Sequence, residues 1–234
     1  MLLILAALGC SGDSTPPAVN PGGNPEAGGP GSPGGPGGPG GPGSPGGNPE
    51  AGNVTGPPPV TKGTISTAEL KLIQVKNGSA EVGATITGVT GSLDFSPGVA
   101  AGELKIDVST WASGNEGRDN NVRGTFFQAV EHPEATFTLE SLENLPEKPL
   151  LIDTEANAVA KGTLSMYAGS VPVSANIKIS RTETGYSLQT TEDLTVSIEG
   201  LGMSENLTAL MALCAHQSVD DTVRIGVNLT LTTD

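Results

Sequence analysis

The sequence predicts an all-β domain of about eight antiparallel strands, a barrel or a sandwich, behind a glycine- and proline-rich segment. Apolar and polar residues alternate with a period of two in residues 103–109, 171–179, 194–198 and 223–231. Such alternation places one face of a strand in a core and the other in water, as antiparallel sheets do. Turn signals such as Asn77-Gly78 separate the alternating stretches.

The first ten residues read as the end of an export signal. They are apolar, too few to span a bilayer as a helix, and end in small residues before Cys10. Ala7-Leu8-Gly9-Cys10 is similar to a bacterial lipobox, which would make Cys10 a lipidated anchor to a membrane. The alternative is an ordinary signal peptide with a chance cysteine. We expect a lipoprotein of the bacterial cell envelope, facing the periplasm or the surface.

Residues 11–62 are expected to form a disordered linker. The octapeptide PGGNPEAG occurs at 21–28 and again at 45–52, with Gly-X-Pro triplets between the two copies. The triplets have collagen periodicity, but they are few and their X position is mostly glycine, so a flexible tether is favoured over a triple helix. The folded domain is therefore expected at 63–234.

In each expected strand, apolar and polar residues alternate or β-branched residues are frequent, and turn signals lie on either side. The expected strands span residues 68–76, 82–95, 103–109, 135–139, 155–166, 171–179, 184–191, 194–198 and 223–231. Two segments interrupt them, 114–134 and 203–217. In the second, Leu207, Leu210, Met211 and Cys214 fall at i, i+3, i+4 and i+7, which predicts a short amphipathic helix starting near Ser204 or Asn206.

The charge balance argues against nucleic acid as a partner. The chain holds 25 Asp and Glu against 11 Lys and Arg. An acidic surface repels phosphate backbones and anionic lipid head groups. Contact with a membrane is therefore expected only through the lipid on Cys10.

Segment 114–134 gathers the residues that most resemble an active site. Glu116, Arg118 and Asp119 could form a general acid–base set, but they crowd into one connection, so a capped turn that pins the loop is favoured. A metal site at His132 is not expected, because no ligand spacing accompanies it. Phe126 and Phe127 are expected to plug one end of the barrel; the alternative is that they form a platform for the ligand, and they could do both.

Cys214 and His216 suggest a redox or nucleophilic site at the end of the expected helix. Cys214 lies on the apolar stripe, however, so we expect it to be a buried, inert thiol. No catalytic residue, metal or cofactor is predicted from the sequence, and the protein is not expected to be an enzyme.

Three blocks of this sequence resemble the YceI-like domain family over about residues 64–233. The first and most specific block is Ile106-Asp107-Val108, Gly114-Asn115-Glu116-x-Arg118-Asp119, Phe126-Phe127, His132-Pro133 and Ala135-Thr136-Phe137. The second is Gly162-Thr163-Leu164-Ser165-Met166 with Val171-Pro172-Val173, and the third is Val219-Asp220-Asp221-Thr222-Val223.

The resemblance implies an eight-stranded antiparallel, lipocalin-like barrel with one or two short helices near its mouth. It also implies export to the envelope and a bound polyisoprenoid-like chain, such as a quinone or its precursor. Some relatives pair into homodimers, so both a monomer and a dimer are open. The alternative function is a surface interaction protein whose barrel is filled and holds no small ligand.

The strand pattern indicates where such a lipid would lie. The inward positions are almost all aliphatic, and only 3% of the chain is aromatic, so bulky fillers are scarce. The residues expected to line the lipid pocket are Leu104, Ile106, Val108, Phe126, Phe127, Phe137, Leu139, Leu164, Val173, Ala175, Ile177, Val196, Ile198, Val223, Ile225 and Val227.

Overall fold

A computed structural model describes residues 61–96, 99–167 and 169–233. The expected signal segment, Cys10 and nearly all of the expected linker lie outside these residues. The described strands are β1 (Lys62–Lys76), β2 (Ala80–Ile86), β3 (Val89–Ser96), β4 (Val99–Asp107), β5 (Glu134–Glu143), β6 (Glu155–Met166), β7 (Gly169–Arg181), β8 (Gly185–Thr190), β9 (Leu194–Ser197) and β10 (Thr222–Thr232).

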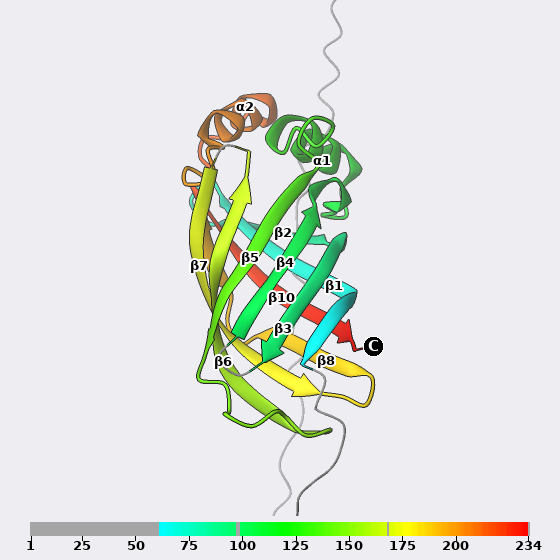
Figure 1. Cartoon of the computed structure of the whole chain (residues 1–234). Coiled ribbons are helices and arrows are strands. Elements are labelled where there is room, and N and C mark those ends of the chain that lie inside the picture. The colour runs from blue at the N-terminus through cyan, green and yellow to red at the C-terminus, as the bar shows by residue number, and fades with distance from the viewer. Residues whose placement is uncertain (1–60, 97–98, 168, 234) are drawn as a thin grey trace, which may run out of the picture. The chain divides into compact units, whose positions relative to one another are not determined.

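The strands form one closed antiparallel barrel (Figure 1). β1 pairs along its length with β10, which joins the first strand to the last and leaves no open edge there. The ten described strands occupy eight positions, because β2 and β3 follow one another beside β1, and β8 and β9 follow one another beside β10. This closure confirms the predicted eight-stranded barrel, and the alternative prediction of a sandwich is wrong.

The strand expected at 82–95 is divided into β2 and β3 at Thr87-Gly88. The amide of Gly88 donates to Oγ1 of Thr110 at 3.0 Å, and a Cβ at Gly88 would lie 2.7 Å from Cγ2 of Thr110. Thr110 belongs to the short 3-10 helix η1 (Val108–Thr110), which follows β4. The chain therefore bends where glycine lets η1 approach the backbone closely.

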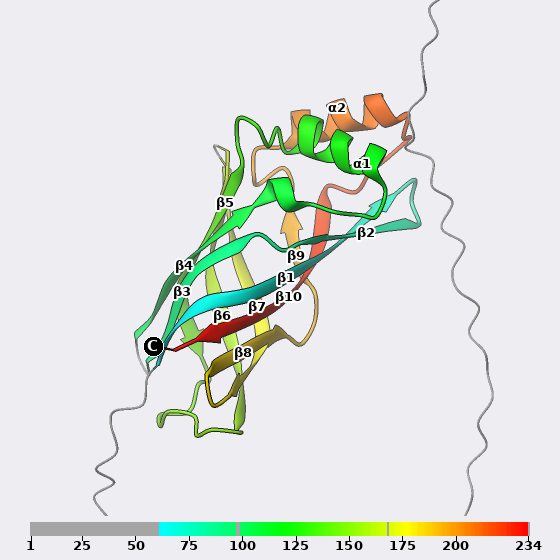
Figure 2. The same ribbon diagram turned by 90° about the vertical axis from the view of Figure 1, so that its right-hand side faces the viewer.

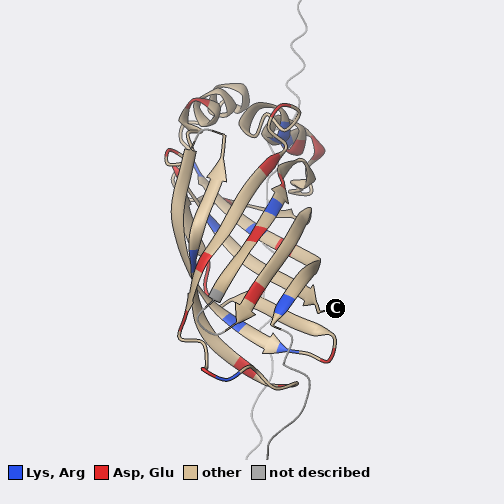
Figure 3. Ribbon diagram, in the orientation of Figure 1, with Lys and Arg blue, Asp and Glu red and all other residues tan. Residues whose placement is uncertain are grey.

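The alternation seen in the sequence sets which side chains face inward. In β4, Leu104 is buried and Ile106 half-buried, while Glu103, Lys105 and Asp107 between them are exposed. Figure 3 shows charged residues distributed along the strands around the barrel. Ion pairs such as Lys105–Glu134, with Nζ to Oε1 at 3.1 Å, link neighbouring strands on this exposed side.

Three helical segments gather at one end of the barrel (Figure 2). They are α1 (Glu116–Asn121), the π-helical turn η2 (Val122–Phe126) and α2 (Ser204–Cys214). The turn after β1 is fixed to the chain beyond α2, since the amide of Asn77 donates to the carbonyl of Ser218 at 2.8 Å. None of the described helices is both long and apolar enough to cross a bilayer.

The helix expected within 203–217 is confirmed as α2, and it begins at Ser204, as expected. No side chain caps α2, and Nδ2 of Asn206 instead donates to the carbonyl of Phe126 at 2.8 Å. The segment expected to be a capped loop forms α1 and η2. Asn115 caps α1, because its Oδ1 accepts from the amide of Arg118 at 3.0 Å.

Candidate functional site

The barrel interior contains two apolar cavities that share part of their walls. The helix-side chamber, of about 160 Å³, lies beneath the helical segments and is lined by residues of β1, β10, η2 and α2, among others. The distal chamber, of about 120 Å³, lies deeper among the strands. Both chambers are lined by the same four side chains, which we call the neck: Leu70, Ile106, Leu164 and Ile225.

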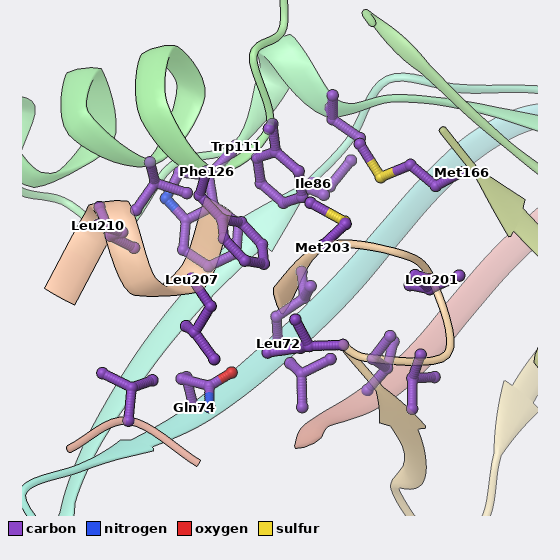
Figure 4. Close-up of a pocket in the computed structure, with 18 of the residues that line it drawn as sticks. Leu72, Gln74, Ile86, Trp111, Phe126, Met166, Leu201, Met203, Leu207 and Leu210 are labelled. Carbon is purple, nitrogen blue, oxygen red and sulfur yellow. The ribbon is translucent and has the colours of Figure 1, made fainter. Parts of the chain in front are cut away.

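The helix-side chamber is walled by flexible and aromatic side chains. Figure 4 shows Met166, Leu201 and Met203 on one side of it and Trp111, Leu207 and Leu210 on the other. Methionine and leucine can adopt several rotamers, so this wall can adapt to guests of different shape. α2 contributes Leu207 and Leu210 as its roof.

An aromatic group closes this chamber towards α1. The ring of Phe127 lies 5.6 Å from that of Trp111 and 5.0 Å from that of Phe126, measured between centroids. Trp111 is 7% exposed, yet its Nε1 has no hydrogen-bond partner among the described residues. A buried N–H without an acceptor is costly and uncommon in folded proteins.

Two cations and a histidine form the polar rim of the helix-side chamber. Lys76 at the end of β1, Arg118 in α1 and His216 after α2 all line it and are all half-buried. Burial lowers the pKa of His216, and the charges of Lys76 and Arg118 lower it further. The three groups are thus partly exposed, and both cations lie near enough to His216 to act on its charge.

The distal chamber is lined almost entirely by aliphatic side chains. Small residues give it width, because Ala160 on β6 and Ala175 on β7 are register partners that both line it. At its far end Phe95 packs against Tyr186, with centroids 5.0 Å apart. Thr190 is the single polar lining residue among the described residues.

All sixteen residues expected to line a lipid pocket lie on the wall of a chamber. Val108, Phe126, Phe127, Val196, Ile198 and Val223 line the helix-side chamber, and Leu104, Phe137, Leu139, Val173, Ala175, Ile177 and Val227 line the distal chamber. Ile106, Leu164 and Ile225 belong to the neck. That these residues contact a lipid remains a prediction.

Sequence reasoning missed several residues of the helix-side chamber. Trp111, Met166, Leu201 and Met203 all line it. Trp111 is the only tryptophan of the chain, a signal that could have been used. Leu201 and Met203 lie in the connection before α2, where no periodicity marks an inward side.

The suspected acid–base set does not converge on the cavity. Asp119 is 7% exposed and accepts from the amide of Ser113 at 2.9 Å and from its hydroxyl. Glu116 is exposed, and of the three only Arg118 lines a chamber. Asp119 therefore holds the start of α1 in place, as the structural interpretation of this segment predicted.

His132 and Tyr167 connect the helical cap to the barrel. Their rings stack with centroids 4.2 Å apart, and the hydroxyl of Tyr167 donates to the carbonyl of Phe127. Nδ2 of Asn206 donates to the same hydroxyl at 3.2 Å, so η2, β6 and α2 meet at Tyr167. Burial raises the pKa of Tyr167. No group of metal-ligating side chains is found in the described part of the chain.

Cys214 differs from its prediction. It is half-buried at the helix-side chamber rather than fully buried.

Comparison with known proteins identifies the domain. A model of the YceI-like domain matches residues 62–231. No curated protein matches the chain.

Two solved structures share the fold at low sequence identity. A polyisoprenoid binding domain from Saccharophagus degradans, implicated in plant cell wall breakdown, superposes with a TM-score of 0.65 at 14% identity, covering 75% of this chain and 99% of that one. Burkholderia cenocepacia BcnA superposes with a TM-score of 0.54 at 15% identity, covering 70% of this chain and 96% of its own. At these identities the likeness establishes the fold.

Proposed function

Because the chain belongs to the YceI-like domain family, we propose that its barrel binds one polyisoprenoid-like chain, such as a quinone or its precursor. The observation that carries this proposal is the pair of apolar chambers joined at the neck of Leu70, Ile106, Leu164 and Ile225. An extended prenyl tail would pass from the helix-side chamber through the neck into the distal chamber. The polyisoprenoid-binding relative from Saccharophagus degradans supports this choice of ligand.

The energetics favour a long apolar tail over a compact ligand. Each buried CH₂ contributes about 0.8 kcal/mol before the cost of ordering the chain. The distal chamber offers almost no polar partner, so a polar group placed there would lose its hydration without compensation. Affinity should therefore rise with tail length until both chambers are filled, less the entropy lost on ordering each added unit.

Export and anchoring complete the proposal. We propose that Cys10 carries a lipid and that residues 11–62 tether the barrel to an envelope membrane. The support is the lipobox-like Ala7-Leu8-Gly9-Cys10 and the Gly/Pro repeats that follow it. Expression of the full chain in a bacterium, followed by membrane fractionation, tests this: a Cys10→Ala variant should move from the membrane pellet to the soluble fraction. Equal membrane retention of both chains would refute the anchor.

The sole tryptophan offers a direct test of lipid binding. Trp111 lines the helix-side chamber, so a ligand entering that chamber should change its fluorescence. We expect titration of the full chain with farnesol to give a saturable change in Trp111 emission. Decane-1,10-diol, whose polar ends do not suit the distal chamber, should compete poorly.

The titration also separates the proposal from its alternative. A filled barrel acting only through its outer surface would leave Trp111 emission unchanged at every farnesol concentration. That outcome, together with no lipid in an organic extract of the purified protein, would reject lipid binding and favour the surface interaction protein.

A further inference from the structure

The ladder of paired strands is interrupted between β7 and β9. β8 pairs with β7 on one side and with β10 on the other. β9 continues the chain beside β10, where Leu194–Ser197 pair with residues 222–225, but it pairs with no other strand of the described residues. We call the boundary between residues 169–176 of β7 and Leu194–Ser197 of β9 the seam.

β7 presents an unpaired edge to the seam. The carbonyl of Asn176 accepts from the amide of Thr191 at 2.9 Å, so the backbone of Asn176 points towards the β8–β9 side. Backbone groups of successive residues point to opposite edges of a strand, so Ser174, Pro172 and Ser170 point to the same side as Asn176. In the part of the chain that the structure describes, no hydrogen bond joins these three residues to β9. Proline lacks an N–H and suits such an edge.

The seam is fastened chiefly at the end that adjoins β8. There Nδ2 of Asn176 donates to Oε1 of Glu192 at 2.6 Å, in addition to the bond from the amide of Thr191. At the other end the two sides are in close contact, because a Cβ at Gly200 would overlap Cγ1 of Val171. Parting β7 from β9 would therefore break few hydrogen bonds, whereas parting two paired strands would break a whole ladder of them.

β2 also lies at an end of the strand order, but hydrogen bonds hold it to the chain around β4. Thr85 and Ala112 exchange two backbone hydrogen bonds, of 2.8 and 2.9 Å. The amide of Asp107 donates to the carbonyl of Gly88 at 2.7 Å. No comparable bridge crosses the middle of the seam among the residues described, so the seam is the place where the barrel wall can part at the lowest cost.

The seam runs beside the neck and the chambers. The residues that border the seam and line a chamber are Val173, Ala175, Leu194 and Val196. Two residues of the neck lie one strand away from the seam, since Ile225 is the register partner of Leu194 and Leu164 is that of Val171. A displacement of β7 from β9 would therefore widen the neck as well as open the wall.

We infer that β7 and β9 part along the seam to admit the prenyl tail sideways into both chambers. This inference rests on the proposed function, because it concerns the route by which the same ligand enters. End-on entry would draw the whole tail between the four aliphatic side chains of the neck, in an interior that is closely packed. Sideways entry lets the length of the tail leave water together, which is where its binding energy comes from.

A disulfide across the seam tests this route. Val171→Cys with Gly200→Cys places two cysteines where the sides of the seam are in contact, within the reach of a disulfide. Stopped-flow fluorescence of Trp111 follows farnesol uptake by the full chain before and after reduction with dithiothreitol. We expect the oxidised form to take up farnesol about tenfold more slowly, because the opening that association requires is blocked. The Kd should stay unchanged, since the cross-link alters the route and not the chambers.

Ser165→Cys with Ser170→Cys is the matched control. Ser165 and Ser170 are register partners on the paired strands β6 and β7, so a disulfide between them leaves the seam free to part. This pair should take up farnesol at the same rate in both redox states. The unaltered chain, oxidised and reduced in the same way, shows any effect of Cys10 and Cys214, and peptide mapping identifies the introduced disulfides.

Asn176→Ala tests the seam without a cross-link. It removes the hydrogen bond to Glu192 at the fastened end and should make uptake about threefold faster. Thr163→Ala is its control, because Oγ1 of Thr163 donates to Oε1 of Glu140 at 2.6 Å between the paired strands β6 and β5. That substitution should leave the uptake rate unchanged.

The outcomes distinguish the lateral route from the proposed function. Equal uptake rates in the oxidised and reduced forms of the Val171→Cys, Gly200→Cys variant overturn the route and leave lipid binding intact. Equal slowing by the Ser165–Ser170 cross-link also overturns it. If the seam variant does not fold, Asn176→Ala decides, and an unchanged rate in that variant overturns the route. If farnesol never changes Trp111 emission in the unaltered chain, the proposed function fails.

Discussion

Asp119 illustrates how a residue that looks catalytic acts in the fold. Its carboxylate accepts two hydrogen bonds from Ser113 and is 7% exposed. Asp119→Ala would leave these donors without a buried acceptor, so we expect a loss of about 2 kcal/mol in the free energy of unfolding. Urea denaturation measures this loss.

Glu116→Gln is the control for Asp119, since Glu116 is exposed in the same helix. It should change stability by less than about 0.5 kcal/mol. Equal effects of the two substitutions would contradict the structural role of Asp119.

The pKa of His216 responds to the charges of Lys76 and Arg118. Its pKa is lowered by burial first, then by Lys76 and Arg118. Lys76→Gln should raise the pKa of His216 but leave it below the ordinary value, because burial persists. An NMR titration of the imidazole measures this shift. Lys105→Gln should leave the titration unchanged, and an unchanged value in Lys76→Gln would show that Lys76 does not act on His216.

The same shift has a consequence for stability. The folded state disfavours the protonated imidazole of His216. The contribution of neutral His216 to the free energy of unfolding is therefore fully present above the unfolded pKa of 6.5. Stability should fall as the pH drops from there through the lower folded pKa. His216→Gln should weaken this dependence in denaturation curves at pH between about 5 and 7; an equally steep dependence in this variant would assign it to other groups.

At the residue scale the sequence could predict the chamber walls within strands. Alternation fixes which side chains of β4 or β10 face inward, as for Leu104 and Val227, because the period of a strand is two. It could not predict Leu201 or Met203, since their inward orientation comes from an aperiodic connection. The presence of both Lys76 and Arg118 on the wall of one chamber also depends on how β1 and α1 are placed in the fold, which no local pattern encodes.

Glycine positions make the strands bend into a barrel. Gly91 in β3 has a φ of +130°, and a Cβ there would lie 2.1 Å from the carbonyl oxygen of Glu103. Gly91→Ala should therefore lower the free energy of unfolding by at least about 3 kcal/mol, through backbone strain and the displacement of β4. Thermal denaturation followed by circular dichroism measures it.

Gly83 in β2 provides the matched substitution. A Cβ at Gly83 would meet no heavy atom within 4 Å. Gly83→Ala should change stability by less than about 1 kcal/mol. Comparable losses in the two variants would mean that the close contact with Glu103 is not what requires glycine at position 91.

At the element scale the strands were predictable and the α1–η2 segment was not. Strands such as β9 and β10 carry uninterrupted alternation. Residues 116–126 contain two glycines and polar residues with low helix propensity, so local preference indicates a loop. The helix forms because Asn115 caps it, Asp119 binds Ser113, and Phe127 packs on Trp111.

The two chambers together should limit the length of the prenyl tail that the barrel can bind. Ala175 lines the distal chamber beside Ala160, its register partner, so Ala175→Phe should place a ring in that space. We expect the Kd for geranylgeraniol to rise about tenfold, which equals the loss of roughly two buried CH₂ groups. Geraniol, which the helix-side chamber can accommodate, should bind as before. Competition against farnesol measures both.

Ser174→Phe is the control for that substitution, because Ser174 precedes Ala175 on β7 and is exposed. It adds the same ring on the outside of the barrel and should leave both affinities unchanged. A rise for geraniol as large as that for geranylgeraniol in Ala175→Phe would contradict the division into two chambers.

At the scale of the whole molecule, composition predicted the kind of interior but not its division. Scarce aromatic residues and aliphatic inward positions favoured unfilled volume in a barrel of this size. The neck arises because Leu70, Ile106, Leu164 and Ile225 come together from four strands, which depends on barrel closure through β1 and β10. No single stretch of sequence carries that information.

The central claim is that one prenyl chain occupies the interior of this barrel. Native mass spectrometry of the full chain, incubated with geranylgeraniol, tests it most directly. The account predicts one bound ligand per barrel, with occupancy reduced by Ala175→Phe and retained by Ser174→Phe. A spectrum that shows only ligand-free protein at saturating geranylgeraniol, or equal occupancy in both variants at subsaturating geranylgeraniol, would contradict it.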